Sequence, residues 1–223
     1  MIEKHKKIDK KGYRDRTIND EIGYKITSID ITRTNRILAS ERLYRLSRKW
    51  EIVFFCMNIL AILFLISSIL FFSASKVMTL ITGLFSLYTI ITQYYYNNLN
   101  YRERGLKYHY LELDLEQQII ELKTLLRKKL TDSELEREYE SIMKNYLYSL
   151  KGYENHEEID NQNRKKLEEG SGSEKGCDKD KNCSKYKKDT LSDSVFYYGN
   201  IVIIILFIIF YVVYLILNKG NGC

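Results

Sequence analysis

The sequence of 223 residues contains no proline and only four cysteines. The absence of proline excludes proline-kinked helices and Pro-rich linkers. Cys177 and Cys183 are separated by five residues, and no second pair accompanies them to complete a zinc site. Cys56 lies within an apolar run, where we expect it only to pack. We therefore expect neither a metal centre nor a cofactor.

Charged side chains are missing from three long apolar runs, at residues 52–72, 77–96 and 195–217. About 20 apolar residues at a rise of 1.5 Å span a bilayer core of about 30 Å, and the backbone must satisfy its own hydrogen bonds there. The four residues 73–76 are too few for anything but an antiparallel hairpin. Without a charge in the membrane, the chain has no residues for a proton relay or a charge-coupled transporter.

The distribution of basic residues predicts an orientation. Lys and Arg gather before the first run, after the second and before the third, whereas the loop at 73–76 holds only Lys76. The positive-inside rule then places the N-terminus and residues 97–194 in the cytoplasm and the C-terminus outside. We expect these side chains to meet anionic lipid headgroups rather than nucleic acid. The candidates for the membrane interface are Arg42, Arg45, Arg48, Lys49, Arg102 and Arg104.

The region before the first run has no apolar core of a signal peptide, so the first membrane helix is expected to direct insertion. Residues 1–27 are predicted to be a polar tail, with a basic helix from residue 28. Two interpretations of that helix stay open. It lies on the inner leaflet as an amphipathic helix, or it extends the membrane helix and packs on the cytoplasmic domain. Trp50 is placed as an interfacial anchor.

Small and polar residues form a stripe along the second membrane helix. They recur at helical spacings of three and four, which places them on one face. Such a face is typical of close helix packing, here against the first helix. The alternative is a weakly polar lining that meets water when several hairpins assemble. The stripe consists of Thr79, Gly83, Ser86, Thr89 and Gln93.

The cytoplasmic segments have helical patterns. Apolar residues from Leu111 to Leu130 recur every three or four positions, so the second membrane helix is predicted to continue to Leu130, broken at most near Gly105. The cytoplasmic helices need each other, the N-terminal segment or neighbouring copies to bury their apolar faces, and we expect this face to contact other copies of the chain. Residues 131–134 form a capping box that opens another helix, which Gly152 ends. Residues 165–194 are charged and rich in Gly and Ser, and predict a disordered linker to a C-terminal anchor at 195–217.

This layout resembles the SLATT family, the SMODS- and SLOG-associating two-transmembrane effectors. The resemblance covers roughly residues 29–164: a basic helix, a hairpin and long cytoplasmic helices. A short signature is most like the fifth subfamily, and the third membrane helix is an addition to the common plan. The signature residues are Tyr153, Glu154, Asn155, His156 and Asp160. We expect His156 to be a cap or a buried hydrogen-bond donor to Asn155 and Asp160, with a phosphate or nucleotide contact as the alternative.

The expected fold class is an all-α integral membrane protein: a two-helix hairpin and long cytoplasmic helices, to which the sequence adds an extra C-terminal membrane helix. The domains are then a tail (1–27), a SLATT-like domain (28–164), a linker (165–194) and a membrane helix (195–217). In the prokaryotic inner membrane, such a protein is expected to form a homo-oligomer and to perforate the bilayer in a conflict system.

The implied partners are a nucleotide-generating or nucleotide-sensing protein, or a reverse transcriptase, encoded nearby. No direct contact with nucleic acid is expected. The family has no catalytic residues to carry over, so we expect no enzyme. The alternative is a membrane-anchored sensor or scaffold that acts through its cytoplasmic helices without conductance.

Overall fold

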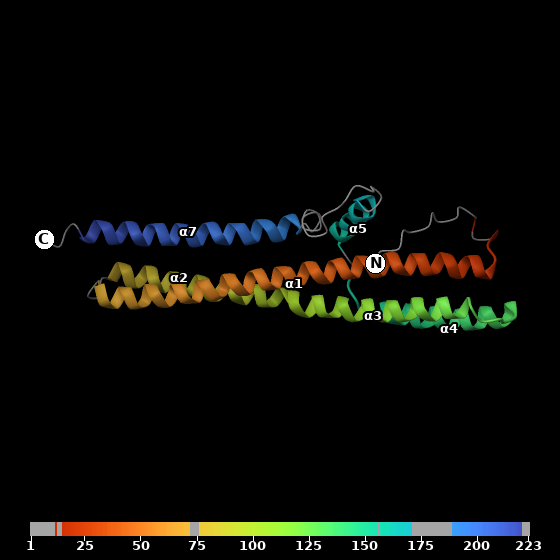
Figure 1. The fold of residues 1–223 in the computed structure, drawn as a ribbon. Coiled ribbons are helices and arrows are strands. Elements are labelled where there is room, and N and C mark those ends of the chain that lie inside the picture. The colour runs from red at the N-terminus through yellow and green to blue at the C-terminus, as the bar shows by residue number, and fades with distance from the viewer. Residues whose placement is uncertain (1–11, 13–14, 72–75, 156, 171–188, 220–223) are drawn as a thin grey trace. The chain divides into compact units, whose positions relative to one another are not determined.

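The computed structural model describes residues 12, 15–71, 76–155, 157–170 and 189–219, and in these residues it is helical without strands (Figure 1). This confirms the all-α prediction. The helices are α1 (Ile18–Phe71), α2 (Lys76–Leu99), α3 (Tyr101–Leu125), α4 (Asp132–Leu150), α5 (Glu158–Gly170) and α7 (Leu191–Lys219).

The chain divides into two compact units. The bundle unit comprises Met1–Tyr44 and Arg102–Lys188, and the membrane unit comprises Arg45–Tyr101 and Asp189–Cys223. Helix α1 contributes its first half to the bundle unit and its second half to the membrane unit. Three helices of the described chain, α1, the helix that starts at Lys76, and α7, are long and apolar enough to cross a membrane. The predicted third membrane helix is therefore present in the structure.

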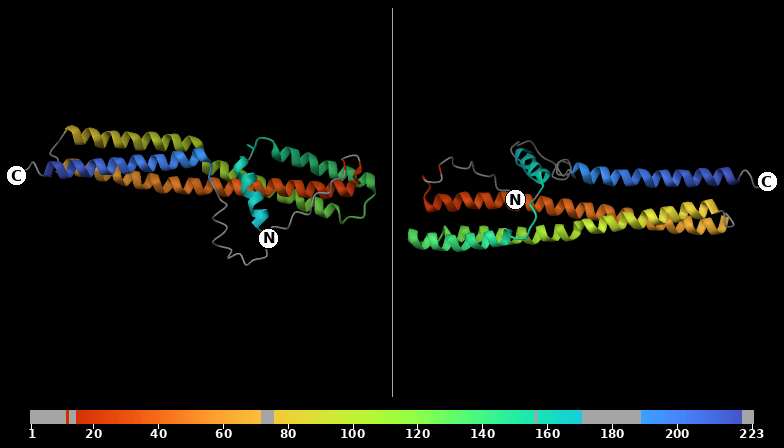
Figure 2. Two further views of the ribbon diagram at one scale, coloured as in Figure 1. Left: turned by 90° about the horizontal axis from the view of Figure 1, so that it is seen from above. Right: turned by 180° about the vertical axis from the view of Figure 1, so that it is seen from behind.

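The membrane unit is held together by an aromatic and apolar cluster from three helices. Phe64 of α1, Met78 and Phe85 of α2 and Tyr211 of α7 form its buried centre. The two views in Figure 2 show α2 and α7 running beside the second half of α1. The buried positions of α2 follow spacings of four and three, the heptad spacing of a helix that packs along its length. They are Met78, Thr82, Phe85, Thr89 and Thr92.

The core of the bundle unit joins α1, α3 and α4. Ile22 and Ile29 of α1 pack with the inward leucines of α3 and with Leu135 and Tyr146 of α4. The face from Leu111 to Leu122 packs on the N-terminal segment and on the next cytoplasmic helix, so the prediction that it contacts other copies was wrong for these residues. Leu111, Leu115 and Leu122 are fully buried within the chain, because α1 and α4 already cover them.

Helix α1 begins ten positions earlier than predicted. Its start at Ile18 is capped reciprocally: Asp20 N donates to Thr17 Oγ1 at 3.2 Å, and Thr17 N donates to Asp20 Oδ2 at 3.4 Å. Residues 28–51 belong to the same helix, and Ile29 and Leu43 are fully buried. The structure thus supports the second interpretation, an extension of the membrane helix packed on other helices.

The break after α2 lies at Asn100, not near Gly105. Asn100 has a φ of 48°, a left-handed conformation that asparagine tolerates better than most residues. Gly105 lies inside α3 at a close approach to α1, where Ser40 Oγ donates to its carbonyl oxygen at 2.9 Å. A Cβ built at Gly105 would lie 3.4 Å from the Cβ of Leu43, so the glycine permits this contact.

The capping box of α4 is confirmed, with Thr131 and Glu134 bonded reciprocally. Gly152 follows the helix at a φ of 85°, which favours glycine.

The predicted linker starts too early, because its first residues, 165–170, belong to α5. Charge together with Gly and Ser predicted disorder there, but α5 is held on α1 by buried polar contacts of Asp160 and Arg164. The remainder up to residue 188, with Cys177 and Cys183, lies outside the described residues.

Candidate functional site

The inward face of α2 carries three threonine hydroxyls within the membrane unit. Thr82, Thr89 and Thr92 are all buried. Thr89 Oγ1 donates to the carbonyl oxygen of Phe85 at 3.0 Å, the usual bond one turn back. The hydroxyl of Thr82 has no hydrogen-bond partner among the described residues, although it is buried. This row of threonines is named the hydroxyl face below.

The predicted small-residue stripe does not face a single neighbour. Thr89 belongs to the hydroxyl face, and Ser86 and Gln93 are half-buried beside it. Thr79 and Gly83 are exposed and line a shallow groove on the outer side of α2. Among the described residues, no atom lies within 4 Å of a Cβ built at Gly83, so none of them closely approaches Gly83. Whether the stripe lines a pore stays a prediction.

Sequence reasoning missed Thr82 and Thr92. The signal that could have found them is the spacing of four, three, four and three that they share with Met78, Phe85 and Thr89. Smallness and polarity selected residues on two sides of the helix, whereas the heptad spacing selects the side that packs.

Helix α7 makes polar and aromatic contacts with both helices of the hairpin. Tyr88 OH donates to Asn200 Oδ1 at 2.5 Å, and the hydroxyls of Ser67 and Tyr211 are hydrogen-bonded. The rings of Phe64 and Tyr211 stack with centroids 4.3 Å apart. Helix α7 is therefore a packed member of the membrane unit and more than the anchor that its apolar composition predicted.

The start of α7 is tied to α1 by ion pairs. Asp189 Oδ1 lies 2.8 Å from Arg45 Nη2, and its Oδ2 lies 2.6 Å from Lys49 Nζ. Burial alone would raise the pKa of Asp189, but hydrogen bonds from Lys49 and Arg45 outweigh it and hold the pKa below its usual range. The carboxylate is thus ionised at neutral pH, and the pairs would weaken only on acidification below the usual pKa.

Arg45 and Lys49 were predicted to meet lipid headgroups, and the structure pairs them with Asp189 instead. Asp189 lies far away in sequence, so its proximity could not be read from local charge.

Trp50 also differs from its prediction as an interfacial anchor. It is 1% exposed within a cluster of aromatic rings from Phe54, Tyr96, Phe196 and Tyr197.

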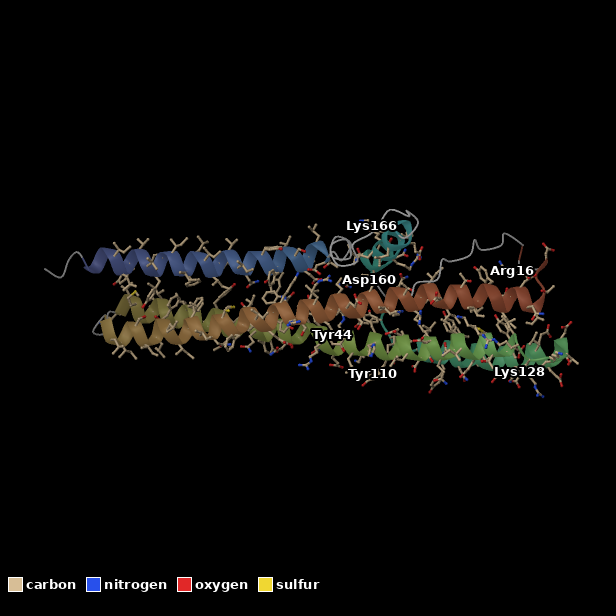
Figure 3. All side chains as sticks on the ribbon, in the orientation of Figure 1. Arg16, Tyr44, Tyr110, Lys128, Asp160 and Lys166 are labelled. Atoms are coloured by element: carbon tan, nitrogen blue, oxygen red, sulfur yellow. The ribbon has the colours of Figure 1, made fainter. Side chains whose placement is uncertain are left out.

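In the bundle unit, the signature residue Asp160 forms a buried ion pair with α1 (Figure 3 labels Asp160 on α5). Its Oδ1 accepts from Arg42 Nε at 2.9 Å and its Oδ2 accepts from Arg42 Nη2 at 3.2 Å. Asp160 is fully buried and Arg42 is 2% exposed. Asp160 Oδ2 also accepts from the backbone N–H of Glu157 at 3.1 Å, close to the start of α5.

Two further signature residues are held by α1 and α3. Arg36 Nη1 donates to the carbonyl oxygen of Glu154 at 2.5 Å, and Tyr108 OH donates to that of Asn155 at 3.1 Å. The carboxylate of Glu154 pairs with Arg104 Nη2 at 2.8 Å. The signature therefore fastens the segment between α4 and α5 to two helices. The expected role of His156 falls outside the described residues.

The prediction for Arg42 at the membrane interface was wrong, because its guanidinium is the buried partner of Asp160. Arg104 is paired with Glu154, while Arg48 and Arg102 are exposed. A second polar contact joins α5 to α1, where Arg164 Nε donates to Asn35 Oδ1 at 3.1 Å. The contact between α5 and α1 is thus built from buried polar groups.

These features define a helical membrane protein with a packed three-helix membrane unit. The family model named SMODS and SLOG-associating 2TM effector domain family 5, which is the fifth SLATT family, matches residues 18–217. The chain belongs to this family. The match extends at both ends beyond residues 29–164, the range over which the sequence resembles the SLATT family, and it includes most of α7. No curated protein and no solved structure matches the chain. The described residues hold no group of three metal-ligating side chains.

Proposed function

We propose that this chain is the membrane effector of a prokaryotic conflict system, which oligomerises and forms a pore or disrupts the membrane. Its family consists of effector domains that associate with SMODS and SLOG proteins, as the family description states. The observation that carries the proposal is the hydroxyl face of α2, a row of hydroxyls in a segment without charged side chains. Such hydroxyls can pack against another helix in a single chain and can face water when several copies assemble.

A conduit requires several copies of the chain. Met78 and Phe85 are fully buried and fill the centre of the membrane unit between the three helices. Packed side chains thus already fill the space beside the buried row of α2 in the described part of a single membrane unit. The hydroxyl faces of several copies, turned toward a common axis, could surround such a column, as polar faces do in channels.

The trigger is proposed to come from a nucleotide-generating or nucleotide-sensing protein, or a reverse transcriptase, encoded nearby. Asp, Glu, Lys, Arg and His are absent from the membrane runs, so gating by proton transfer through carboxylates, amines or imidazoles within them has no residues to act on. The chain acts in this scheme without catalysis.

The test is potassium or dye leakage from cells that express the chain, alone and with its genomic neighbour active. Replacing Thr82, Thr89 and Thr92 together with valine keeps the side-chain shape and removes the hydroxyls. This variant should reach the membrane at the normal level and lose most of the leakage, because water would meet a methyl-lined wall. The control Thr79→Val changes an exposed threonine on the outer side of α2 and should leak normally.

An intact membrane potential under activating conditions, with the native protein at its normal level, would contradict the proposal. That outcome would favour the alternative, a sensor or scaffold that acts through the bundle unit.

The proposed orientation is tested by thiol labelling. The excess of Lys and Arg before the first run and around 97–194 predicts that Cys177 is inside and Cys223 outside. In intact cells with single-cysteine variants, an impermeant maleimide should label Cys223 and spare Cys177. Labelling of Cys177 alone would reverse the assignment.

A further inference from the structure

Three hydrogen-bonding side chains of α1 and α3 converge on the segment between α4 and α5. Arg104 and Tyr108 lie one turn apart on α3, which places them on the same face of the helix. Arg36 of α1 reaches the same place, because its guanidinium carbon lies 5.2 Å from the centre of the Tyr108 ring. The close approach of the two helices at Gly105 brings these side chains together. Arg36, Arg104 and Tyr108 form the donor cluster.

The donor cluster is bonded to two consecutive residues of that segment. Arg36 Nη1 donates to the carbonyl oxygen of Glu154, and Arg104 Nε and Nη2 each lie 2.8 Å from its carboxylate oxygen Oε2. Tyr108 OH donates to the carbonyl oxygen of Asn155. Two guanidinium groups and a hydroxyl thus meet one carboxylate and two neighbouring carbonyl oxygens.

Arg36 is the member of the cluster whose charge is least compensated. It is 4% exposed, its Nε has no hydrogen-bond partner among the described residues, and its Nη1 is bonded to a neutral carbonyl oxygen. Burial lowers the pKa of Arg36, and the nearby charge of Asp160 does not outweigh that effect. Burial also disfavours the charge of Arg42, but hydrogen bonds to Asp160 outweigh it and raise the pKa of Arg42. Arg36 would therefore be stabilised by an anion that reaches it.

We propose that the donor cluster is a binding site for a phosphate group, and that Glu154 occupies this site until a phosphate-bearing ligand displaces it. A guanidinium group fits the oxygens of a phosphate with parallel hydrogen bonds, and a tyrosine hydroxyl donates to a further oxygen. The oxygens of Glu154 and Asn155 already lie where such oxygens would be bonded. A phosphate offers more oxygens and more charge than one carboxylate, so it satisfies Arg36 as well as Arg104.

Glu154 can leave the donor cluster without the unfolding of a helix. Its side chain is 61% exposed and that of Arg104 is 29% exposed, so a ligand can reach the outer part of the cluster. Residues 151–155 are not helical, and Gly152 has open space around it. Such segments open at a lower free energy than packed helices do. A ligand would thus replace the carboxylate at Arg104 first and the carbonyl oxygen at Arg36 afterwards.

The phosphate group can belong to a soluble molecule or to a lipid headgroup, and the two sources are distinguished by experiment. Calorimetric titration uses the purified full-length chain in an uncharged detergent. One arm adds sodium pyrophosphate, and the other adds phosphatidylglycerol in mixed micelles. We expect saturable binding in at least one arm, which identifies the source.

The arginines of the donor cluster should carry this binding. Arg36→Gln and Arg104→Gln should each weaken it about tenfold, the loss expected for one charged hydrogen bond. Arg102→Gln removes an exposed arginine from the same helix and should bind like the native chain. Because Arg104 is partly exposed, its variant stays informative even if the buried Arg36 variant does not fold.

Glu154→Gln gives a result that a purely structural role would not give. It removes the charge that competes with the ligand for Arg104, so it should tighten binding about tenfold. Glu158→Gln removes the same charge from an exposed position at the start of α5 and should leave the affinity unchanged.

Trypsin cleavage after Lys151 reports the displacement itself. Lys151 is exposed directly after α4, and saturating ligand should speed its cleavage by freeing the segment that follows. Slower cleavage would contradict displacement. The binding site is overturned if neither arm saturates, if Arg102→Gln weakens binding as much as Arg104→Gln, or if Glu154→Gln leaves the affinity unchanged. The inference goes beyond the proposed function, since binding is measured without leakage and a chain that never leaks would leave it intact.

Discussion

Replacing Asp160 with alanine is expected to lower the free energy of unfolding of the bundle unit by about 3–5 kcal/mol, because it leaves a buried guanidinium without its carboxylate. Glu157 Oε1 remains 3.2 Å from Arg42 Nη2, but this carboxylate is 40% exposed and screened by water. The loss should therefore fall toward the lower end of that range. Thermal unfolding and limited proteolysis of the purified protein in detergent measure it.

Two matched variants test the cause. The double variant Arg42→Met, Asp160→Leu replaces both charges by apolar groups and should recover most of the lost stability, since removing a whole buried pair is often neutral. Glu158→Ala, at an exposed position of the same helix, should change little. Native-like stability of Asp160→Ala would show that the ion pair does not hold α5 on α1.

Leu115→Ala and Leu122→Ala should each destabilise the bundle unit by about 2–5 kcal/mol, since both side chains are fully buried and leave a cavity. Leu113→Ala is the control on the same helix, because Leu113 is 46% exposed and its loss should cost less than about 0.5 kcal/mol. Denaturant or thermal unfolding, followed by circular dichroism, gives the comparison.

Aspartate at the same buried positions should have a larger effect than alanine. Leu115→Asp with Leu122→Asp places two carboxylates in the core with α1 and α4, so we expect the bundle unit to unfold. Normal unfolding temperatures for these leucine variants would mean that α3 is not part of the core.

The membrane helices could be predicted from the sequence because each depends on local properties. A run of uncharged apolar residues long enough to span the bilayer needs no partner to be recognised. The capping box at Thr131 and the turn at Gly152 are local in the same way. The break at Asn100 was missed because asparagine adopts a left-handed conformation only occasionally, whereas Gly105 looked like the more common signal.

The contacts that build the candidate site join residues far apart in sequence. Arg42 and Asp160 are 118 positions apart, and Lys49 and Asp189 are 140 apart. Basic residues beside a membrane run have a general explanation in lipid headgroups, and nothing local shows that a carboxylate reaches them first. The same holds for α7, whose apolar composition conceals Asn200 and Tyr211 as contacts to the hairpin.

The aromatic cluster around Trp50 gives the molecule an optical reporter of one unit only. Trp50 is the single tryptophan of the sequence, and it lies in the membrane unit with its ring 5.0 Å from that of Phe196 on α7. Its emission spectrum therefore senses whether the start of α7 stays against α1, while the bundle unit contributes only tyrosine fluorescence. Selective excitation of tryptophan can follow the membrane unit in the same sample in which circular dichroism follows all helices.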